Sequence, residues 1–80
     1  MAKPKYLKRK EADDRFVKEV RGRIAHEGYR HKDIAAKAEI SPGCFSTRLR
    51  DPEMLRVKDL RAIIETVGPD LQIVMDLITA

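Results

Sequence analysis

The sequence lacks the features that mark secreted or membrane-spanning chains. It has one cysteine, Cys44, and no tryptophan. A lone cysteine forms no internal disulfide, which is typical of a protein that works in a reducing compartment, and we expect a cytoplasmic location. No run of about 18 apolar residues is present, so no membrane span is predicted. The basic start MAKPKYLKRK is not followed by an apolar stretch, unlike a secretory signal.

Signs of catalytic, metal or cofactor chemistry are also missing. His26 and His31 lie on either side of a predicted helix break, with only Cys44 as a possible thiolate, so zinc-site spacing is absent. No glycine-rich phosphate loop follows a predicted strand, and 80 residues leave little chain to enclose a substrate pocket. We therefore expect no enzyme activity, no metal, no cofactor and no small-molecule substrate.

Positive charge is present and unevenly distributed. The formal net charge is +4, and the first ten residues hold five of the 17 basic residues and no acid. Residues 28–50 are also basic, whereas residues 51–80 are acidic. This polarity favours an anionic partner such as a phosphate backbone, although a solubilising tail with ordinary surface charge is the alternative. The five basic residues among the first ten, which we expect to form a flexible arm, are Lys3, Lys5, Lys8, Arg9 and Lys10.

The apolar pattern predicts a flexible basic arm at residues 1–12 and one all-α domain at residues 13–80. A first helix is expected over residues 13–27, ended by Gly28, and a short second helix lies in RHKDIAAKA. A third helix is expected over residues 42–50 and a fourth over residues 57–67, ended by Gly68. Pro69 can open a fifth helix, which completes a compact five-helix domain.

Four signals coincide at the start of the third helix. Ser41 is a good N-cap, and Pro42 suits the first helical position because it lacks an amide hydrogen there. Proline also favours an extended conformation at the residue before it. Ile40 and Phe45 occupy the two positions of a hydrophobic staple. Together these signals predict a sharp helix start at Ser41.

The last segment, residues 69–79, carries more apolar residues than one core-facing stripe needs. As a helix it places Leu71, Val74, Met75 and Ile78 on one face and leaves Ile73 and Leu77 as a second apolar pair. We expect that pair to form a homodimer interface. Because alternate residues from Leu71 to Leu77 are also apolar, a terminal strand remains an alternative.

Two short helices joined by a few residues, with Ala35 at the close approach and a sharp start at Ser41, predict a helix-turn-helix unit. From residue 16 to 67 the chain resembles Cro and phage-repressor type regulators, the xenobiotic-response-element-like family. The resemblance rests on Gly28-Tyr29, the IAAKA run, Ile40-Ser41, Phe45-Ser46 and LRDPEMLRVKDLRAIIETVG. It implies a lambda-repressor-like fold that binds double-stranded DNA.

The resemblance also implies which residues face DNA. The positions that read base edges in the family correspond to Pro42, Gly43, Ser46 and Thr47, none of which makes the bidentate base contacts of Arg, Gln or Asn. The family usually has glycine where this chain has Glu39 and glutamine where it has His31. Phosphate contacts are expected from Arg30, His31, Lys32, Arg48, Arg50, Arg56 and Lys58.

These observations favour a sequence-specific transcriptional regulator, of phage or mobile-element type, that binds an operator as a homodimer and represses by occupying it. The sparse base-reading helix and the acidic second half of the chain leave two alternatives open. One is a helix-turn-helix fold reused as a protein-binding module, such as an antirepressor or inhibitor. The other is nonspecific or architectural DNA binding.

Overall fold

A computed structural model describes residues 9–79 of the chain, and within that range all regular structure is helical. Five α-helices follow one another: α1 (Arg9–Glu27), α2 (His31–Ala38), α3 (Pro42–Arg50), α4 (Val57–Thr66) and α5 (Leu71–Thr79). A single 3₁₀ turn, η1 (Pro52–Met54), lies between α3 and α4. The prediction of an all-α domain with five helices is confirmed. Within residues 9–79, every helix is too short or too polar to cross a membrane.

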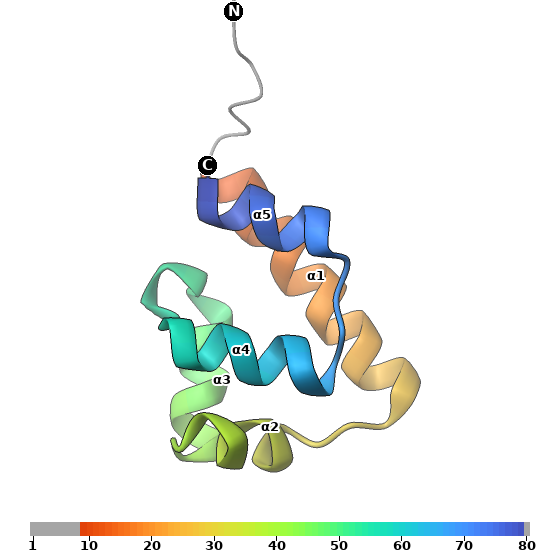
Figure 1. Ribbon diagram of the computed structural model, residues 1–80, viewed down its shortest axis with the longest axis vertical. Helices are drawn as coiled ribbons and strands as arrows, with labels where there is room; N and C mark the ends of the chain where they lie inside the picture. Colours follow the sequence, from red (N-terminus) through yellow and green to blue (C-terminus); the bar gives the residue numbers. More distant parts are fainter. Residues whose placement is uncertain (1–8, 80) are drawn as a thin grey trace, which may run out of the picture.

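The helices surround one apolar core. Figure 1 shows α1 running the length of the molecule with α5 alongside it, while α2, α3 and α4 gather at the other side. All five α-helices contribute to the core, and its largest side chains are completely buried. Its members are Phe16, Val20, Ile24, Ile34, Ala35, Ala38, Phe45, Leu49, Ala62, Ile63, Val67 and Val74.

Several helices begin or end at the capping residues that the sequence predicts. Gly28 and Gly68 have positive φ angles of 80° and 67°, the left-handed conformation that glycine adopts without a steric penalty when it terminates a helix. Ser41 is the N-cap of α3, and its Oγ accepts a hydrogen bond from the Cys44 amide at 3.0 Å. Ile40 packs against the core that contains Phe45, as the staple pattern predicts.

The predicted boundary between arm and domain at residue 12 is wrong. Helix α1 begins at Arg9, so Arg9 and Lys10 lie in its first turn, and Ala12 is buried. The acidic pair Asp13-Asp14 suggested a later start, but Arg9 to Ala12 are all good helix formers and extend the helix toward the N-terminus. The other predicted arm residues, Lys3, Lys5 and Lys8, lie outside the described residues.

The last segment is a helix and not a strand. Two contacts hold α5 against α1. The Asp70 amide donates a hydrogen bond to Glu19 Oε2 at 3.0 Å, and Arg15 pairs with Asp76 at 3.6 Å. Because helices show 3.6 residues per turn, the alternation of apolar residues along this segment was misleading.

The apolar faces of α5 differ from the sequence prediction. Ile73 and Leu77, expected to need a partner, instead pack against the monomer core together with buried Val74. The exposed apolar residues are Leu71 at 63%, Met75 at 52% and Ile78 at 59%. The sequence alone did not reveal which face of α5 would turn toward the core, because that orientation depends on how α5 packs against α1. We call Leu71, Met75 and Ile78 the α5 stripe.

Candidate nucleic-acid interface

Helix α3 presents its N-terminal half to solvent. Phe45 and Leu49 point into the core and are completely buried, which turns the opposite side of the helix outward. Pro42, Gly43 and Thr47, three of the four predicted base-facing residues, are exposed. A Cβ added at Gly43 would meet no atom within 4 Å, so this end of α3 leaves room for close approach by a partner.

A short turn at residues 39–41 sets α3 against α2. Glu39 ends α2 in the left-handed conformation, with φ 62° and ψ 40°. The Ile40 amide then donates to the Ala35 carbonyl at 3.0 Å, which closes the turn. Glu39 is the one non-glycine residue among residues 9–79 with a positive φ angle. The turn fixes the direction in which α3 leaves α2.

His31 joins the start of α2 to the middle of α3. Its Nδ1 lies 3.1 Å from Ser46 Oγ in a hydrogen bond, and its ring meets Phe45 edge-on at 5.2 Å between centroids. Both His31 and Ser46 are half-buried. Ser46 was predicted to face bases and His31 to bind phosphate, but the structure shows each holding the other in place. Their polar atoms brace α3 against α2.

Arg48 is not the free surface cation that the sequence suggested. Its Nη1 donates a hydrogen bond to Asp59 Oδ2 at 2.9 Å, and the two side chains are only 15% and 1% exposed. The same carboxylate oxygen accepts the Arg56 amide at 2.9 Å at the start of α4. Asp59 thus links α3 to α4. The sequence reasoning missed Asp59, although an acidic residue at the third position of a helix is a recognisable capping signal.

Lys58 is also partly neutralised. Its ammonium group pairs with the carboxylate of Glu39, and both side chains are well exposed. The hydrogen bond from Lys58, and then its positive charge, lower the pKa of Glu39 and so favour its carboxylate form. Lys58 therefore contributes less to an anion-binding surface than its sequence position indicated.

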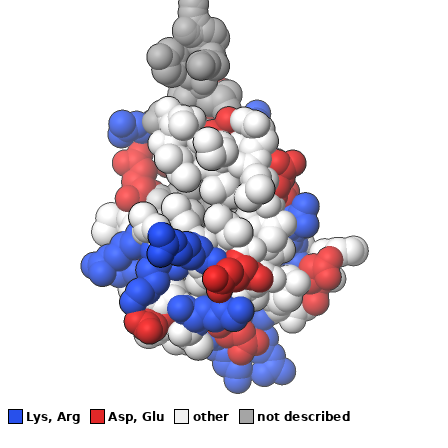
Figure 2. Space-filling view, in the orientation of Figure 1, with Lys and Arg blue, Asp and Glu red and all other residues white. Residues whose placement is uncertain are grey.

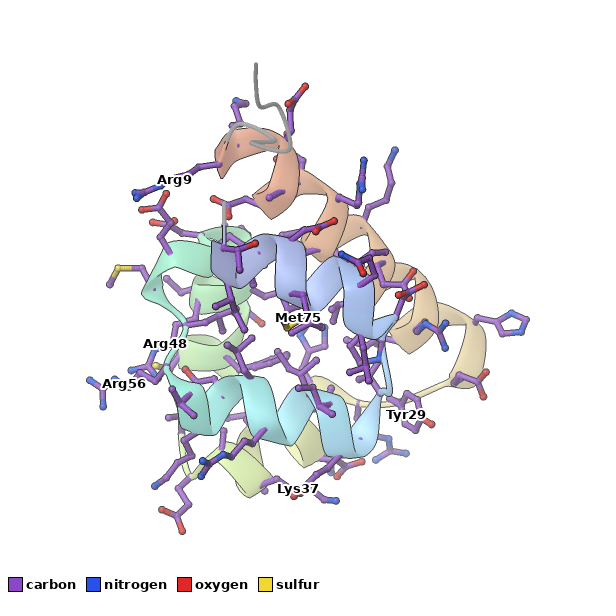
Figure 3. All side chains as sticks on the ribbon, turned by 45° about the horizontal axis from the view of Figure 1, so that its top comes forward. Arg9, Tyr29, Lys37, Arg48, Arg56 and Met75 are labelled. Atoms are coloured by element: carbon purple, nitrogen blue, oxygen red, sulfur yellow. The ribbon has the colours of Figure 1, made fainter. Side chains whose placement is uncertain are left out.

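The remaining predicted phosphate contacts are available. Arg30, Lys32, Arg50 and Arg56 are exposed, and none of the ion pairs seen within residues 9–79 involves them. Figure 2 shows basic side chains gathered over the lower left of the molecule, where α3 meets α4. Figure 3 shows Arg56 projecting outward there, beside Arg48. Lys37, on the exposed side of α2, adds a cation that the residue-by-residue prediction omitted.

An acidic cluster bounds this basic surface where α1 approaches η1. Burial, and then the negative charges of Glu53, Asp51 and Asp14, raise the pKa of Asp13. The cluster makes that side of the molecule unfavourable for a polyanion. It restricts the cationic surface to the ends of α2 and α3 and the start of α4.

The surface offers exposed cations beside an exposed helix end. Among residues 9–79, no three His, Cys, Asp or Glu side chains are arranged to hold a metal ion. Comparison of the chain with protein-family models, curated proteins and solved structures found no match. The function must therefore be inferred from the geometry of this surface.

Proposed function

We propose that this protein is a sequence-specific DNA-binding transcriptional regulator of the lambda-repressor-like class, acting in the cytoplasm and not as an enzyme. In this proposal α2 and α3 form the helix-turn-helix, and α3 enters the major groove by its N-terminal half. One observation carries the proposal. Pro42, Gly43 and Thr47 lie exposed on a helix whose opposite side, Phe45 and Leu49, is buried, and the exposed cations of the surface form no ion pair in the described part of the chain.

The cations supply the affinity. Arg30 and Lys32 flank the start of α2, where unpaired backbone amides and the helix dipole already favour an anion. Arg50 and Arg56 lie at the far end of α3 and at the start of α4. Phosphates that lie against the start of α2 and against the far end of α3 would each meet a cation, and binding would release counterions there.

Few side chains would contact base edges directly. Thr47 is the one exposed polar side chain among the predicted base-facing residues, and it suits a thymine methyl group or a base acceptor. Pro42 and Gly43 provide close fit without hydrogen bonds from their side chains. We expect the shape and deformability of the DNA to supply the rest of the specificity.

The α5 stripe supports a homodimer, with a different set of contacts from the one predicted. Leu71 and Ile78 lie four residues before and three residues after Met75, so two antiparallel copies of α5 can place Met75 on Met75 and Leu71 on Ile78. Figure 2 shows that the surface over α5 and toward α4 is largely free of charge. A dimer would bind two half-sites about one helical turn apart, and operator occupancy would repress transcription.

The experiment is a titration of labelled duplex with the full chain at several salt concentrations. Affinity should fall steeply with salt, and Arg56→Gln should reduce the slope of log K against log salt by about 0.9. Arg21→Gln is the matched control, because Arg21 is an exposed arginine on α1 and is not among the predicted phosphate contacts. It should leave affinity nearly unchanged.

Other outcomes would point to the alternative functions. Equal affinity for a selected and a scrambled duplex would indicate architectural binding. If the protein does not bind DNA even at low salt and instead recovers a stoichiometric protein partner, the fold is a protein-binding module.

A further inference from the structure

The Arg48–Asp59 pair is the most enclosed charged contact among the ion pairs of residues 9–79. Asp59 Oδ2 receives both Arg48 Nη1 and the Arg56 amide, each at 2.9 Å. The other oxygen, Oδ1, is buried and accepts no hydrogen bond from the described residues. Arg48 is thus the only side chain in the described part of the chain that neutralises this carboxylate.

This enclosure keeps Arg48 from acting as a phosphate ligand. A phosphate that drew the guanidinium away would leave the Asp59 carboxylate buried without a counter-charge, and an uncompensated buried charge is strongly unfavourable. Arg50 and Arg56 carry no such penalty because both are exposed and unpaired in the described structure. Near this end of α3, Arg48 therefore stabilises the fold through Asp59, whereas Arg50 and Arg56 face solvent.

The pair also joins α3 to α4 and so sets the orientation of one helix relative to the other. Arg48 belongs to α3 and directly follows exposed Thr47, and Asp59 belongs to the first turn of α4. Through Oδ2, Asp59 fixes the backbone of Arg56 as well. One carboxylate oxygen therefore sets the position of the proposed reading helix relative to a cation that would anchor it on the backbone.

Resting on the proposed function, we propose that Arg48 and Asp59 are positioning residues for base discrimination and make no phosphate contact. The pair holds α3 at the angle at which Thr47 meets a base edge while Arg56 meets the backbone. Base contacts depend on such angles, whereas Coulomb attraction to a line of phosphates tolerates small rotations. Loss of the pair should reduce sequence discrimination and leave the salt dependence intact.

The test compares four proteins on two probes. The probes are a duplex recovered by selection from a random pool and a scrambled duplex of equal length and composition. The proteins are wild type, Arg48→Met/Asp59→Asn, Arg56→Gln and the control Arg21→Gln. The double variant leaves no orphan charge, keeps the formal net charge, and retains an amide oxygen to accept the Arg56 amide. A fifth protein, Arg48→Lys, keeps the charge of the ion pair without the guanidinium geometry and is expected to fold.

We expect the double variant to bind the scrambled duplex with wild-type affinity and wild-type salt slope. Its ratio of affinities for the two duplexes should fall about tenfold or more, which is the loss of roughly one base contact. Arg48→Lys should give an intermediate ratio and the wild-type slope. Arg56→Gln should do the reverse, lowering the slope by about 0.9 and largely preserving the ratio.

Each contrary result has a distinct meaning. A double variant that loses as much salt slope as Arg56→Gln would identify Arg48 as a phosphate ligand and overturn the inference while the proposed function stands. An unchanged slope with an unchanged affinity ratio would show a purely structural pair, which also overturns it. If wild-type protein binds neither duplex, the proposed function fails and the inference fails with it.

Discussion

Replacing Met75 with lysine is expected to abolish the proposed homodimer. Met75 is the central residue of the α5 stripe and is 52% exposed, with Leu71 and Ile78 on either side at 63% and 59%. In an antiparallel α5 pair, Met75→Lys removes the central apolar contact from both copies. It also places two ammonium groups at the two-fold axis, where they repel each other.

The magnitude follows from the exposed fractions. Full burial of a Leu, Ile or Met side chain contributes about 1.5–3 kcal/mol, and a partner can cover only the exposed half, which leaves roughly 1 kcal/mol for each. Six such side chains in two copies contribute roughly 5–9 kcal/mol, against an association cost of about 4–15 kcal/mol. The most favourable difference is about 5 kcal/mol, so dimerisation in free solution should be no tighter than about 0.2 mM. Met75→Lys should weaken it by about 100-fold.

Sedimentation equilibrium of the full chain measures this directly. The matched control is Met54→Lys, since Met54 is 60% exposed on η1 and outside the α5 stripe. Wild type and Met54→Lys should dissociate with similar constants, and Met75→Lys should stay monomeric through the same concentration range. A wild-type protein that is monomeric at millimolar concentration, or a Met75→Lys protein that dimerises like the control, would refute the reasoning about this face.

Three further variants test the fold and its charges. Phe45→Ala should cost about 3–5 kcal/mol in the free energy of unfolding, measured in urea, because its ring is fully buried at the centre of the core; a loss below 1 kcal/mol would contradict that placement. Glu39→Gly should raise Tm by relieving the left-handed backbone and should increase the salt slope of DNA binding by freeing Lys58; an unchanged slope would show that Lys58 lies off the DNA path. The hydrogen bond from the Asp70 amide, followed by that from Arg23, lowers the pKa of Glu19, so its contribution to stability is present above its ordinary pKa of 4.5 and is lost as pH falls through the lowered value. The Tm advantage of wild type over Glu19→Gln should therefore shrink on acidification, and an advantage that grows instead would contradict the contact.

Local signals in the sequence were sufficient for most helix boundaries. Ser41 and Pro42 fix the start of α3 through capping chemistry that involves only neighbouring residues, and Gly28 and Gly68 end helices for equally local reasons. The inward faces of α2 and α3 also followed from periodicity, because each of these short helices has only one apolar side. The start of α1 was placed too late because the acidic pair Asp13-Asp14 resembles the first turn of a helix, whereas no capping residue marks the actual start at Arg9.

The errors lie where long-range contacts decide. Ile73 and Leu77 were predicted to face a partner, but both pack against the core. The orientation of α5 depends on its packing against α1, including the hydrogen bond from the Asp70 amide to Glu19, and neighbouring residues do not reveal it. Arg48 was counted among surface cations, because its partner Asp59 is on another helix. No pattern in the neighbouring residues distinguishes a buried arginine from an exposed one, so this part of the site required the three-dimensional structure.

Selection of bound duplexes from a random pool, carried out in parallel with wild type and Thr47→Ala, tests most directly whether α3 reads DNA. We expect wild type to enrich a defined sequence with two-fold symmetry, and Thr47→Ala to lose preference at one position in each half-site while the others persist. Enrichment of no sequence by wild type, or an identical preference from both proteins, would contradict the reading role assigned to the exposed face of α3.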